Sequence, residues 1–410
     1  MKSRSHCTST VRTIFILLMS VVILVMLPEK VEAKKDTVTY TIGPKTNPCD
    51  NSKKYKNYNQ KTKQYYMILS YMKQLESDGG GTLVFKKGTY TITNTIYVPS
   101  NVEIIFKDGV VIKKGNDTGT TAMTASKSIF TLCDPSKSNT KGAYCKYNGV
   151  ENVSFIGEGN VVIDLNYVKD VIGIIMGHNQ NVTIQGITFQ NMQSGHFIEM
   201  DASKNITIDK CTFKNHKDST NNNKEAINLD TPDKKTEGFH AVWTSYDKTP
   251  NYNITIKNST FKDLERAIGT HKYSGDKYHT KIEILNNEIT NCDIDAIRVM
   301  NWKDITIQKN RFTNVANQKA GYRAILISGS SKMNISDNHF KDTSRSIQLM
   351  PWKNSGPGEE YEITYNKVTD EECTLMLQNT LENVQEKFIR INNTYGEFVN
   401  NTVKIYFAVE

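Results

Sequence analysis

Apolar and polar residues alternate in a short phrase that the chain repeats, and an aromatic residue or an isoleucine closes each copy. The copies close at Phe189, Phe213, Phe261, Ile289, Phe312 and Phe340. Alternation with period two is typical of a β-strand that buries one face. The apolar anchors from Ile184 to Ile335 are separated by 24, 48, 28, 23 and 28 residues. This spacing indicates the stacked coils of a solenoid, with one long insertion in the 48-residue step.

A second strand type follows at a fixed offset in each coil, as in Ala-Ile-Asn-Leu229, Ala-Ile-Arg-Val299 and Ala-Ile-Leu-Ile327. Two strand types per coil predict an all-β parallel β-helix. Polar residues also recur two positions before the closing residue, at Cys211, Ser259, Asn287, Asn310 and Asn338. Stacked amide side chains of this kind bond to one another along the axis. The stretch from Lys61 to Gln74 has apolar residues at helical spacing and predicts a helix that caps the first coil.

The start of the repeat region resembles a known superfamily. Residues 78–90, Asp-Gly-Gly-Gly-Thr-Leu-Val-Phe-Lys-Lys-Gly-Thr-Tyr, are followed by Val-Pro-Ser-Asn-Val-Glu-Ile-Ile-Phe at 98–106. These segments look like the beginning of the helix in pectate lyase-like proteins, and above all in polygalacturonase-type glycoside hydrolases. The resemblance extends over roughly residues 60–370. It implies a right-handed parallel β-helix solenoid with an N-terminal helical cap.

The chain divides into three expected parts. Residues 1–33 carry basic residues, an apolar run from Ile14 to Leu27 and a small-residue ending at Ala33, which indicates a signal peptide. An uncleaved N-terminal anchor is the alternative, although the run is short for a membrane span. Residues 34–80 form the N-terminal segment with the capping helix, and residues 81–410 form the β-helix with C-terminal coils or a cap. We therefore expect a secreted or cell-surface protein with no membrane segment beyond the signal.

The composition and net charge limit the classes of partner that we expect the chain to bind. The formal net charge of +8 falls to about +6 without the signal segment, which points weakly to an acidic partner such as a uronate or sulfated glycan. No basic run is interleaved with aromatic residues, so we expect no nucleic-acid partner. The cysteines form no C-x-x-C pair, which argues against zinc, and a Cys133–Cys145 disulfide is left open. We expect a monomer.

The second strand series carries the candidate chemistry. Its outward positions change from apolar to polar over a few central coils and then back. One outward column contains Glu199, Asn228 and Arg298, and the next contains Asp201, Asp230 and His271. Because neighbouring strands lie about 4.8 Å apart, Asp201, Asp230 and His271 should form a ladder. Carboxylates this close cannot both ionise cheaply, so one should act as a general acid unless a cation lies between them.

The turn that enters this sheet adds His196, Glu225 and Arg266. By the polygalacturonase resemblance, His196 matches the first catalytic aspartate and Glu225 the paired one. Arg298 matches the substrate-binding arginine, but Met300 stands where that family has lysine, and its other motifs are absent. The resemblance therefore implies a related hydrolase or lyase. The expected catalytic residues are Asp201, Asp230, Glu225, His271 and Arg298.

Loops that follow these strands supply aromatic and histidine side chains. The long insertion holds His240 and Trp243, and a shorter loop holds Tyr273 and His279. Insertions in solenoids tend to collect on the binding face, where aromatic rings can stack on sugars. The expected substrate-binding residues are His196, Glu199, Asn228, His240, Trp243, Tyr273 and His279.

These features predict an exported carbohydrate-active enzyme that cleaves glycosidic bonds of a polysaccharide with paired carboxyl groups and no required cofactor. One alternative is a calcium-dependent polysaccharide lyase, with Ca²⁺ held by Glu199, Asp201 and Asp230. Another is a non-catalytic glycan-binding surface protein or adhesin. The three differ in whether a polysaccharide is depolymerised and whether its products absorb in the ultraviolet.

Overall fold

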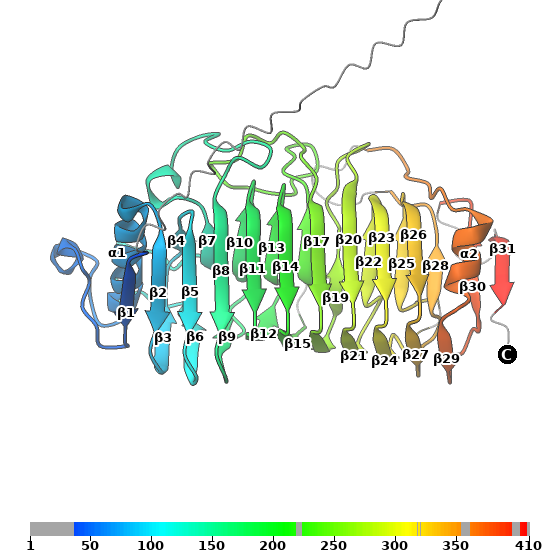
Figure 1. Cartoon of the computed structure of the whole chain (residues 1–410), viewed down its shortest axis with the longest axis horizontal. Coiled ribbons are helices and arrows are strands. Elements are labelled where there is room, and N and C mark those ends of the chain that lie inside the picture. The colour runs from blue at the N-terminus through cyan, green and yellow to red at the C-terminus, as the bar shows by residue number, and fades with distance from the viewer. Residues whose placement is uncertain are drawn as a thin grey trace, which may run out of the picture. The chain divides into compact units, whose positions relative to one another are not determined.

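The computed structural model describes residues 37–218, 224–317, 319, 321–353, 361–395 and 402–407. The expected signal peptide, residues 1–33, lies outside these residues. Within them the chain winds through three long sheets, and one coil contributes a strand to each sheet in turn (Figure 1). The all-β parallel β-helix predicted from the sequence is confirmed. Among the described residues, no helix combines the length and apolar character needed to cross a membrane.

The first sheet has ten parallel strands. In spatial order they are β1 (Thr39–Ile42), β2 (Gly81–Phe85), β5 (Val102–Phe106), β8 (Glu151–Gly157), β11 (Gln180–Gln185), β14 (Lys204–Asp209), β17 (Tyr252–Lys257), β20 (His279–Leu285), β23 (Trp302–Gln308) and β26 (Ser331–Ser336). The pairing of β1 with β2 shows that the N-terminal segment also contributes a strand.

The second sheet also has ten parallel strands. They are β3 (Gly88–Ile92), β6 (Val110–Lys114), β9 (Val162–Asp164), β12 (Thr188–Gln193), β15 (Thr212–Lys217), β18 (Thr260–Leu264), β21 (Glu288–Cys292), β24 (Arg311–Val315), β27 (His339–Lys341) and β29 (Thr380–Glu382).

The third sheet has eleven strands, and its last pair, β30 and β31, is antiparallel. The strands are β4 (Ile96–Val98), β7 (Ser128–Leu132), β10 (Ile172–Gly177), β13 (His196–Asp201), β16 (Glu225–Asp230), β19 (Arg266–Gly269), β22 (Ile297–Met300), β25 (Ile325–Ser328), β28 (Ile347–Leu349), β30 (Phe388–Asn392) and β31 (Thr402–Phe407).

The core lies inside the coils, where the alternating apolar residues of all three sheets meet. Identical residues stack along the axis: the rings of Phe189, Phe213 and Phe261 are 5.0 and 4.8 Å apart between centroids. Asn181, Asn205 and Asn253 adopt positive φ where the strands of the first sheet begin, a conformation that asparagine tolerates well. Their amides bond to one another from coil to coil. The stack is therefore built from repeated equivalent positions.

Helices cover parts of the stack. α1 (Lys63–Asp78) buries Met67, Ile68, Met72 and Leu75, and it packs on β2, β3 and β4. This confirms the predicted N-terminal capping helix. The shorter helix α2 (Asp370–Met376) packs on β26, and the Glu372 carboxylate accepts a hydrogen bond from the backbone of Met333. Two short 3₁₀ helices, η1 (Asn51–Lys54) and η2 (Pro135–Lys137), lie in connecting segments.

Candidate functional site

The outer face of the third sheet carries the column of side chains expected from the sequence. Strand pairing places Ile175 beside Glu199, Glu199 beside Asn228, and Asn228 beside Gly269. Gly269 in turn pairs with Arg298. The register therefore brings Glu199, Asn228 and Arg298 onto one face within a few coils, as predicted.

The second column differs from the expectation of an open ladder. Asp201 and Asp230 are paired in register, but both are fully buried, because residues of the long insertion cover the ends of these strands. Strand β19 ends at Gly269, so His271 does not extend the ladder. Instead, the backbone N–H groups of His271 and Lys272 donate to Asp230 Oδ1 at 3.1 and 2.9 Å. Asp230 thus ties this turn to the sheet.

Glu225 lies at the centre of a buried charge network. Its Oε1 accepts hydrogen bonds from Arg266 Nη1 at 3.1 Å and from Arg298 Nη2 at 2.8 Å. Burial alone would raise the pKa of Glu225, but Arg298, His271 and Arg266 outweigh it and hold the pKa well below its usual range. Glu225 is therefore ionised and structurally paired, and its carboxylate does not face an open groove.

The network continues through residues that the sequence did not single out. Arg266 Nη2 pairs with Asp295 Oδ2 at 3.2 Å, and Arg323 pairs with Asp295 Oδ1 at 2.9 Å. Burial lowers the pKa of Arg298 to about 10, with the charge of Arg266 adding to the effect. Glu225 and Asp295 thus neutralise two of the three buried positive charges of Arg266, Arg298 and Arg323.

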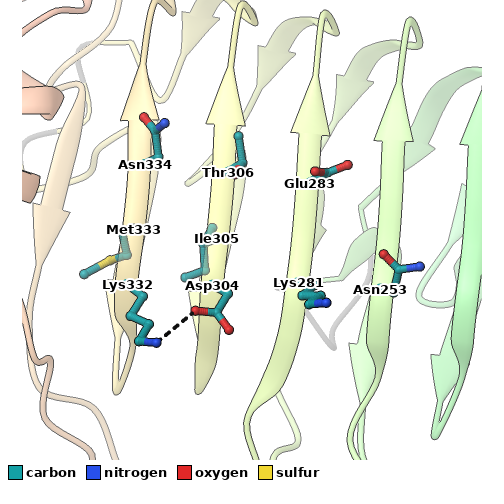
Figure 2. Close-up of a pocket in the computed structure, with 9 residues that line it drawn as sticks. All are labelled: Asn253, Lys281, Glu283, Asp304, Ile305, Thr306, Lys332, Met333 and Asn334. Atoms are coloured by element: carbon teal, nitrogen blue, oxygen red, sulfur yellow. Dashed lines mark ion pairs between the residues drawn. The ribbon is translucent and has the colours of Figure 1, made fainter. Parts of the chain in front are cut away.

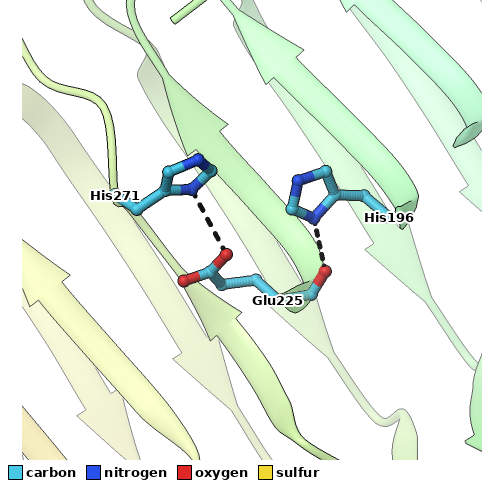
Figure 3. A group of neighbouring side chains, drawn as sticks. All are labelled: His196, Glu225 and His271. Atoms are coloured by element: carbon cyan, nitrogen blue, oxygen red, sulfur yellow. Dashed lines mark hydrogen bonds and ion pairs between the residues drawn. The ribbon is translucent and has the colours of Figure 1, made fainter. Parts of the chain in front are cut away.

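Two histidines flank Glu225 (Figure 3). His196 Nδ1 donates to the backbone carbonyl of Glu225 at 2.6 Å, and burial lowers the pKa of His196 to about 3. His196 is therefore neutral, and its Nε2 keeps a free lone pair. His271 Nδ1 lies 3.3 Å from Glu225 Oε2 and 3.2 Å from Asn228 Oδ1. The two rings are nearly parallel, with centroids 5.8 Å apart.

The pKa values of Glu199 and Asp201 shift in the opposite direction to that of Glu225. Burial, with the nearby charge of Asp230, raises the pKa of Glu199 to about 8. Burial and the charges of Glu199 and Asp230 raise the pKa of Asp201 well above its usual value. A neutral carboxyl group at pH 7 is therefore expected for Glu199, and at Asp201 the same causes favour the protonated form.

Among the described residues, two groups of ligand atoms are close enough to hold a metal. His196, Glu225 and His271 form the first, but the Glu225 carboxylate is already paired with two arginines. His216, Asp218 and Asp293 form the second. There, burial disfavours the imidazolium, but the hydrogen bonds to Asp293 and to the Asp263 backbone, with the charges of Asp293 and Glu265, together outweigh it and raise the pKa of His216 to about 9. A protonated imidazole does not bind a metal ion.

The acids proposed for Ca²⁺ have the right donor atoms. Both carboxyl oxygens of Asp201 and Oδ2 of Asp230 are buried and have no hydrogen-bond partner within the described residues. Carboxylate oxygens are the ligands that Ca²⁺ prefers. Glu199, Asp201 and Asp230 therefore offer donor atoms of the right type. Among the described residues, however, they do not form a group whose ligand atoms all lie within 4.8 Å of one another, and a shared proton is the other way to satisfy them.

A groove of about 470 Å³ lies over β4, β7, β10 and β13, beneath the insertion. Glu199 is at its wall, and Tyr97, Thr131 and Ile175 line it from the outer face of the sheet. Phe239, His240, Val242 and Trp243 line it from the insertion. Aromatic rings beside hydroxyl groups and a carboxyl group are the usual components of a sugar-binding site.

The groove accounts for some of the expected binding residues. Glu199, His240 and Trp243 line it. Trp243 is 3% exposed and packs edge-on against Tyr144 and Phe239, so it shapes the groove more than it projects into it. His196 and Asn228 are buried beside the Glu225 network.

Two expected binding residues require correction. Tyr273 is fully buried in a second apolar cluster with Met300, Leu326 and Met350. His279 is also fully buried, and its Nδ1 accepts the backbone N–H of Asn251 at 2.9 Å, which anchors the end of the insertion. Both side chains hold loops against the sheet, because each loop needs its own packing anchor.

Tyr97, Thr131 and Phe239 belong to the groove but were missed from the sequence. Tyr97 and Thr131 could have been predicted from the sequence, because Tyr97 pairs with Thr131 and Thr131 with Ile175 in the same outward column. Extending that column two coils toward the N-terminus finds them. Phe239 lies in an irregular loop, where no periodicity signals its position. Cys133 and Cys145, whose pairing was left open, are both free thiols in the structure.

A second hollow, of about 450 Å³, lies on the outer face of the first sheet, over β17, β20, β23 and β26 (Figure 2). Its charges are mixed: Lys332 pairs with Asp304 at 3.6 Å, and Glu283 accepts from Thr255 at 3.1 Å. No aromatic ring is among the described residues that line it. It has the character of a solvated charged surface.

Comparison with known proteins supports the fold. The family described as right handed beta helix region matches residues 172–404. "Plasmin and fibronectin-binding protein A" of Streptococcus pneumoniae (strain ATCC BAA-255 / R6) is 27% identical over 288 residues, which are 63% of this chain and 38% of that protein. The chain thus spans about two fifths of the length of this relative.

Two solved structures show the same architecture. The surface adhesin PfbA of Streptococcus pneumoniae has a TM-score of 0.56 at 20% identity, over 82% of this chain and 77% of that one. A tailspike protein of the E. coli bacteriophage HK620, solved with a hexasaccharide, has a TM-score of 0.52 at 15% identity, over 76% and 59%. At these identities the likeness concerns the fold.

Proposed function

This chain belongs to the right-handed β-helix family, and we propose that it is a secreted or cell-surface protein that binds a polysaccharide on its third sheet. The observation that carries the proposal is the groove of about 470 Å³ that Tyr97, Phe239 and Trp243 line together with Glu199. A surface adhesin and a saccharide-bound tailspike share the fold, which is in keeping with this role.

The test is a binding screen of the full chain on immobilised polysaccharides, with plasmin and fibronectin included because the matched relative is named for them. The variant Tyr97→Ala removes a half-buried ring from the groove floor. We expect it to weaken glycan binding by about tenfold, the equivalent of about 1.4 kcal/mol. Tyr365→Ala, which removes a ring that is 57% exposed and outside the groove, is the matched control. Equal binding by both variants, or binding of the two proteins alone, would contradict the proposal.

Glycosidic bond cleavage is a second candidate function, and one observation favours it. The pKa of Glu199 is raised to about 8, so a protonated carboxyl group stands at the groove wall beside Asp230, as a general acid should. Glu225 and Arg298 are poorer candidates, because they are paired with each other. The test is release of reducing ends from a bound polysaccharide, lost in Glu199→Gln and Asp230→Asn. Products that absorb in the ultraviolet and require Ca²⁺ would instead indicate the lyase version.

A further inference from the structure

The Glu199 carboxyl group is buried at the groove without a polar partner among the described residues. It is 8% exposed, lies at the groove wall, and makes no hydrogen bond or ion pair within the described part of the chain. The other buried glutamate of the site, Glu225, has two arginines. A buried carboxyl group without a partner is costly, so it gains more than an exposed one from a ligand that supplies a donor.

The charges around Glu199 favour a cationic donor. Asp201 and Asp230 lie beside it: the charge of Asp230 raises the pKa of Glu199, and Glu199 in turn raises the pKa of Asp201. Lys224 acts in the other direction, from the start of the next coil's strand. Arg298 and Arg266 form their ion pairs with Glu225, and Arg266 also with Asp295; Arg298 interacts with Asp230 as well, but neither arginine pairs with Glu199.

The groove itself lacks positive charge. None of its described lining residues is a lysine or an arginine, and Glu199 is the only acid among them. The rings of Tyr97 and Trp243 are also in the lining, and aromatic faces attract cations. A uronate or sulfated glycan, which the net charge of the chain suggested, would meet a carboxyl group and no cation here.

Resting on the proposed function of this groove, we propose that its ligand is a glycan with free amino groups, one of which places its ammonium on Glu199. The ammonium supplies the missing donor and the positive charge that the acids lack. The neutral parts of the sugar contact Tyr97, Thr131 and the insertion. An N-acetylated glycan of the same backbone keeps the contacts with Tyr97, Thr131 and the insertion but has no ammonium to place on Glu199.

Binding of an amino glycan at Glu199 should also be linked to the release of a proton. In the free protein Glu199 is protonated at neutral pH, because burial and Asp230 raise its pKa to about 8. An ammonium at Glu199 favours the carboxylate, so the carboxyl proton should be released to solvent when the amino glycan binds at a pH where both its amino group and Glu199 are protonated; an unprotonated amine would instead take up that proton. A neutral glycan should release none.

The experiment compares hexamers of β-1,4-linked glucosamine, its N-acetylated form, and galacturonic acid by titration calorimetry on the full chain. Two buffers of different ionisation enthalpy report the protons exchanged. We expect the glucosamine hexamer to bind at least about tenfold more tightly than the N-acetylated one, with proton release. In Glu199→Gln we expect both the preference and the proton release to disappear. Glu283→Gln, an exposed acid on the first sheet, should keep both.

The outcomes separate this inference from the proposed function. If neutral or acidic polysaccharides bind in the groove and the amino hexamer has no advantage over the N-acetylated one, the amine assignment is wrong and polysaccharide binding stands. If the preference survives in Glu199→Gln, the ammonium is recognised elsewhere and the assignment is also wrong. If no polysaccharide binds at all, the proposed function fails and this inference fails with it.

Discussion

Asp201 is completely buried, and neither oxygen of its carboxyl group has a hydrogen-bond partner in the described part of the chain. Asp230, its neighbour in the next coil, has one such oxygen and two bonds from backbone N–H groups. A bare carboxylate in this position is unfavourable, so either a proton or a cation must be present. We therefore expect the stability of the folded chain to depend on the protonation of this pair or on a cation bound there.

The variant Asp201→Asn tests this pair. Burial and the neighbouring acids raise the pKa of Asp201 in the folded protein. The stabilising effect of its proton is complete below about pH 4, the unfolded value, and is lost as the pH rises through the folded value. We therefore expect the melting temperature of the wild type to fall toward alkaline pH, and Asp201→Asn to melt about 2–4 °C higher than the wild type there but not near pH 4.

Calorimetric melting in EDTA and in Ca²⁺ at acidic and alkaline pH provides the measurement. If the acids hold Ca²⁺, the ion should stabilise the wild type at alkaline pH and leave Asp201→Asn unchanged. Asp304→Asn, which removes a partly exposed acid from the first sheet, is the control. Identical pH profiles for wild type and Asp201→Asn would show that the buried acid has an ordinary pKa.

Single residues of the site were predictable only where the strand register fixed them. Glu199 and Asn228 follow from alternation, because each strand must bury its other face. The burial of Tyr273 and His279 did not follow, because their loops have no period and fold back on the sheet through contacts with distant residues. Asp295 and Arg323 were missed for a related reason: their role comes from pairing across coils.

Among the elements, the turns between the first and second sheets carry a continuous polar ladder. Cys211 and Ser259 begin it, and Asn287, Asn310 and Asn338 continue it through backbone and amide hydrogen bonds of 2.9–3.1 Å. The structure adds Asn379 as a further member, which the sequence did not reveal because its coil departs from the repeat. Asn287, Asn310 and Asn338 each join three consecutive coils, and Asn379 joins the last two.

Asn310→Ala should break this ladder in its middle. The Asn310 amide donates to the carbonyl of Ile284 and to Asn338, and its oxygen accepts from Asn287. The loss leaves buried partners unsatisfied, so we expect destabilisation by about 2–5 kcal/mol in urea unfolding. Asn314→Ala removes exposed amide bonds to Asn291 and Asn317 from a residue at positive φ and should cost only about 1 kcal/mol, mostly in backbone strain. Similar costs for the two would argue against a structural ladder.

The regular elements were the most predictable part of the fold. The interior ladder, the strand types and the capping helix follow from local patterns that every coil repeats. The C-terminal end was less clear, because α2 and the antiparallel β31 replace the repeat where the stack ends. Such capping pieces are atypical by necessity, since they have a neighbour on one side only.

At the scale of the whole β-helix, the groove depends on contacts between distant coils. The insertion follows β16, yet its residues Phe239 and Trp243 pack over Gly177, at the end of β10. Tyr144 and Cys133, from still earlier coils, join the same apolar cluster. The insertion thus bends back along the stack and forms one wall of the groove, and strands of earlier coils form its floor. This arrangement makes the groove separable from the stability of the coils beneath it.

Gly177→Ala tests that separation. A methyl group at this position would lie 2.8 Å from ring atoms of both Phe239 and Trp243, too close for either ring to stay in place. The insertion must shift, so we expect glycan affinity to fall by about tenfold while unfolding stability falls by only about 1–3 kcal/mol. Gly43→Ala, whose methyl group would have 3.8 Å of clearance from Thr46, should change neither. Because the coils below Gly177 keep their own core, retained glycan affinity in Gly177→Ala would mean that the ligand binds on the β-helix without the insertion, and the groove assignment would have to move to another face.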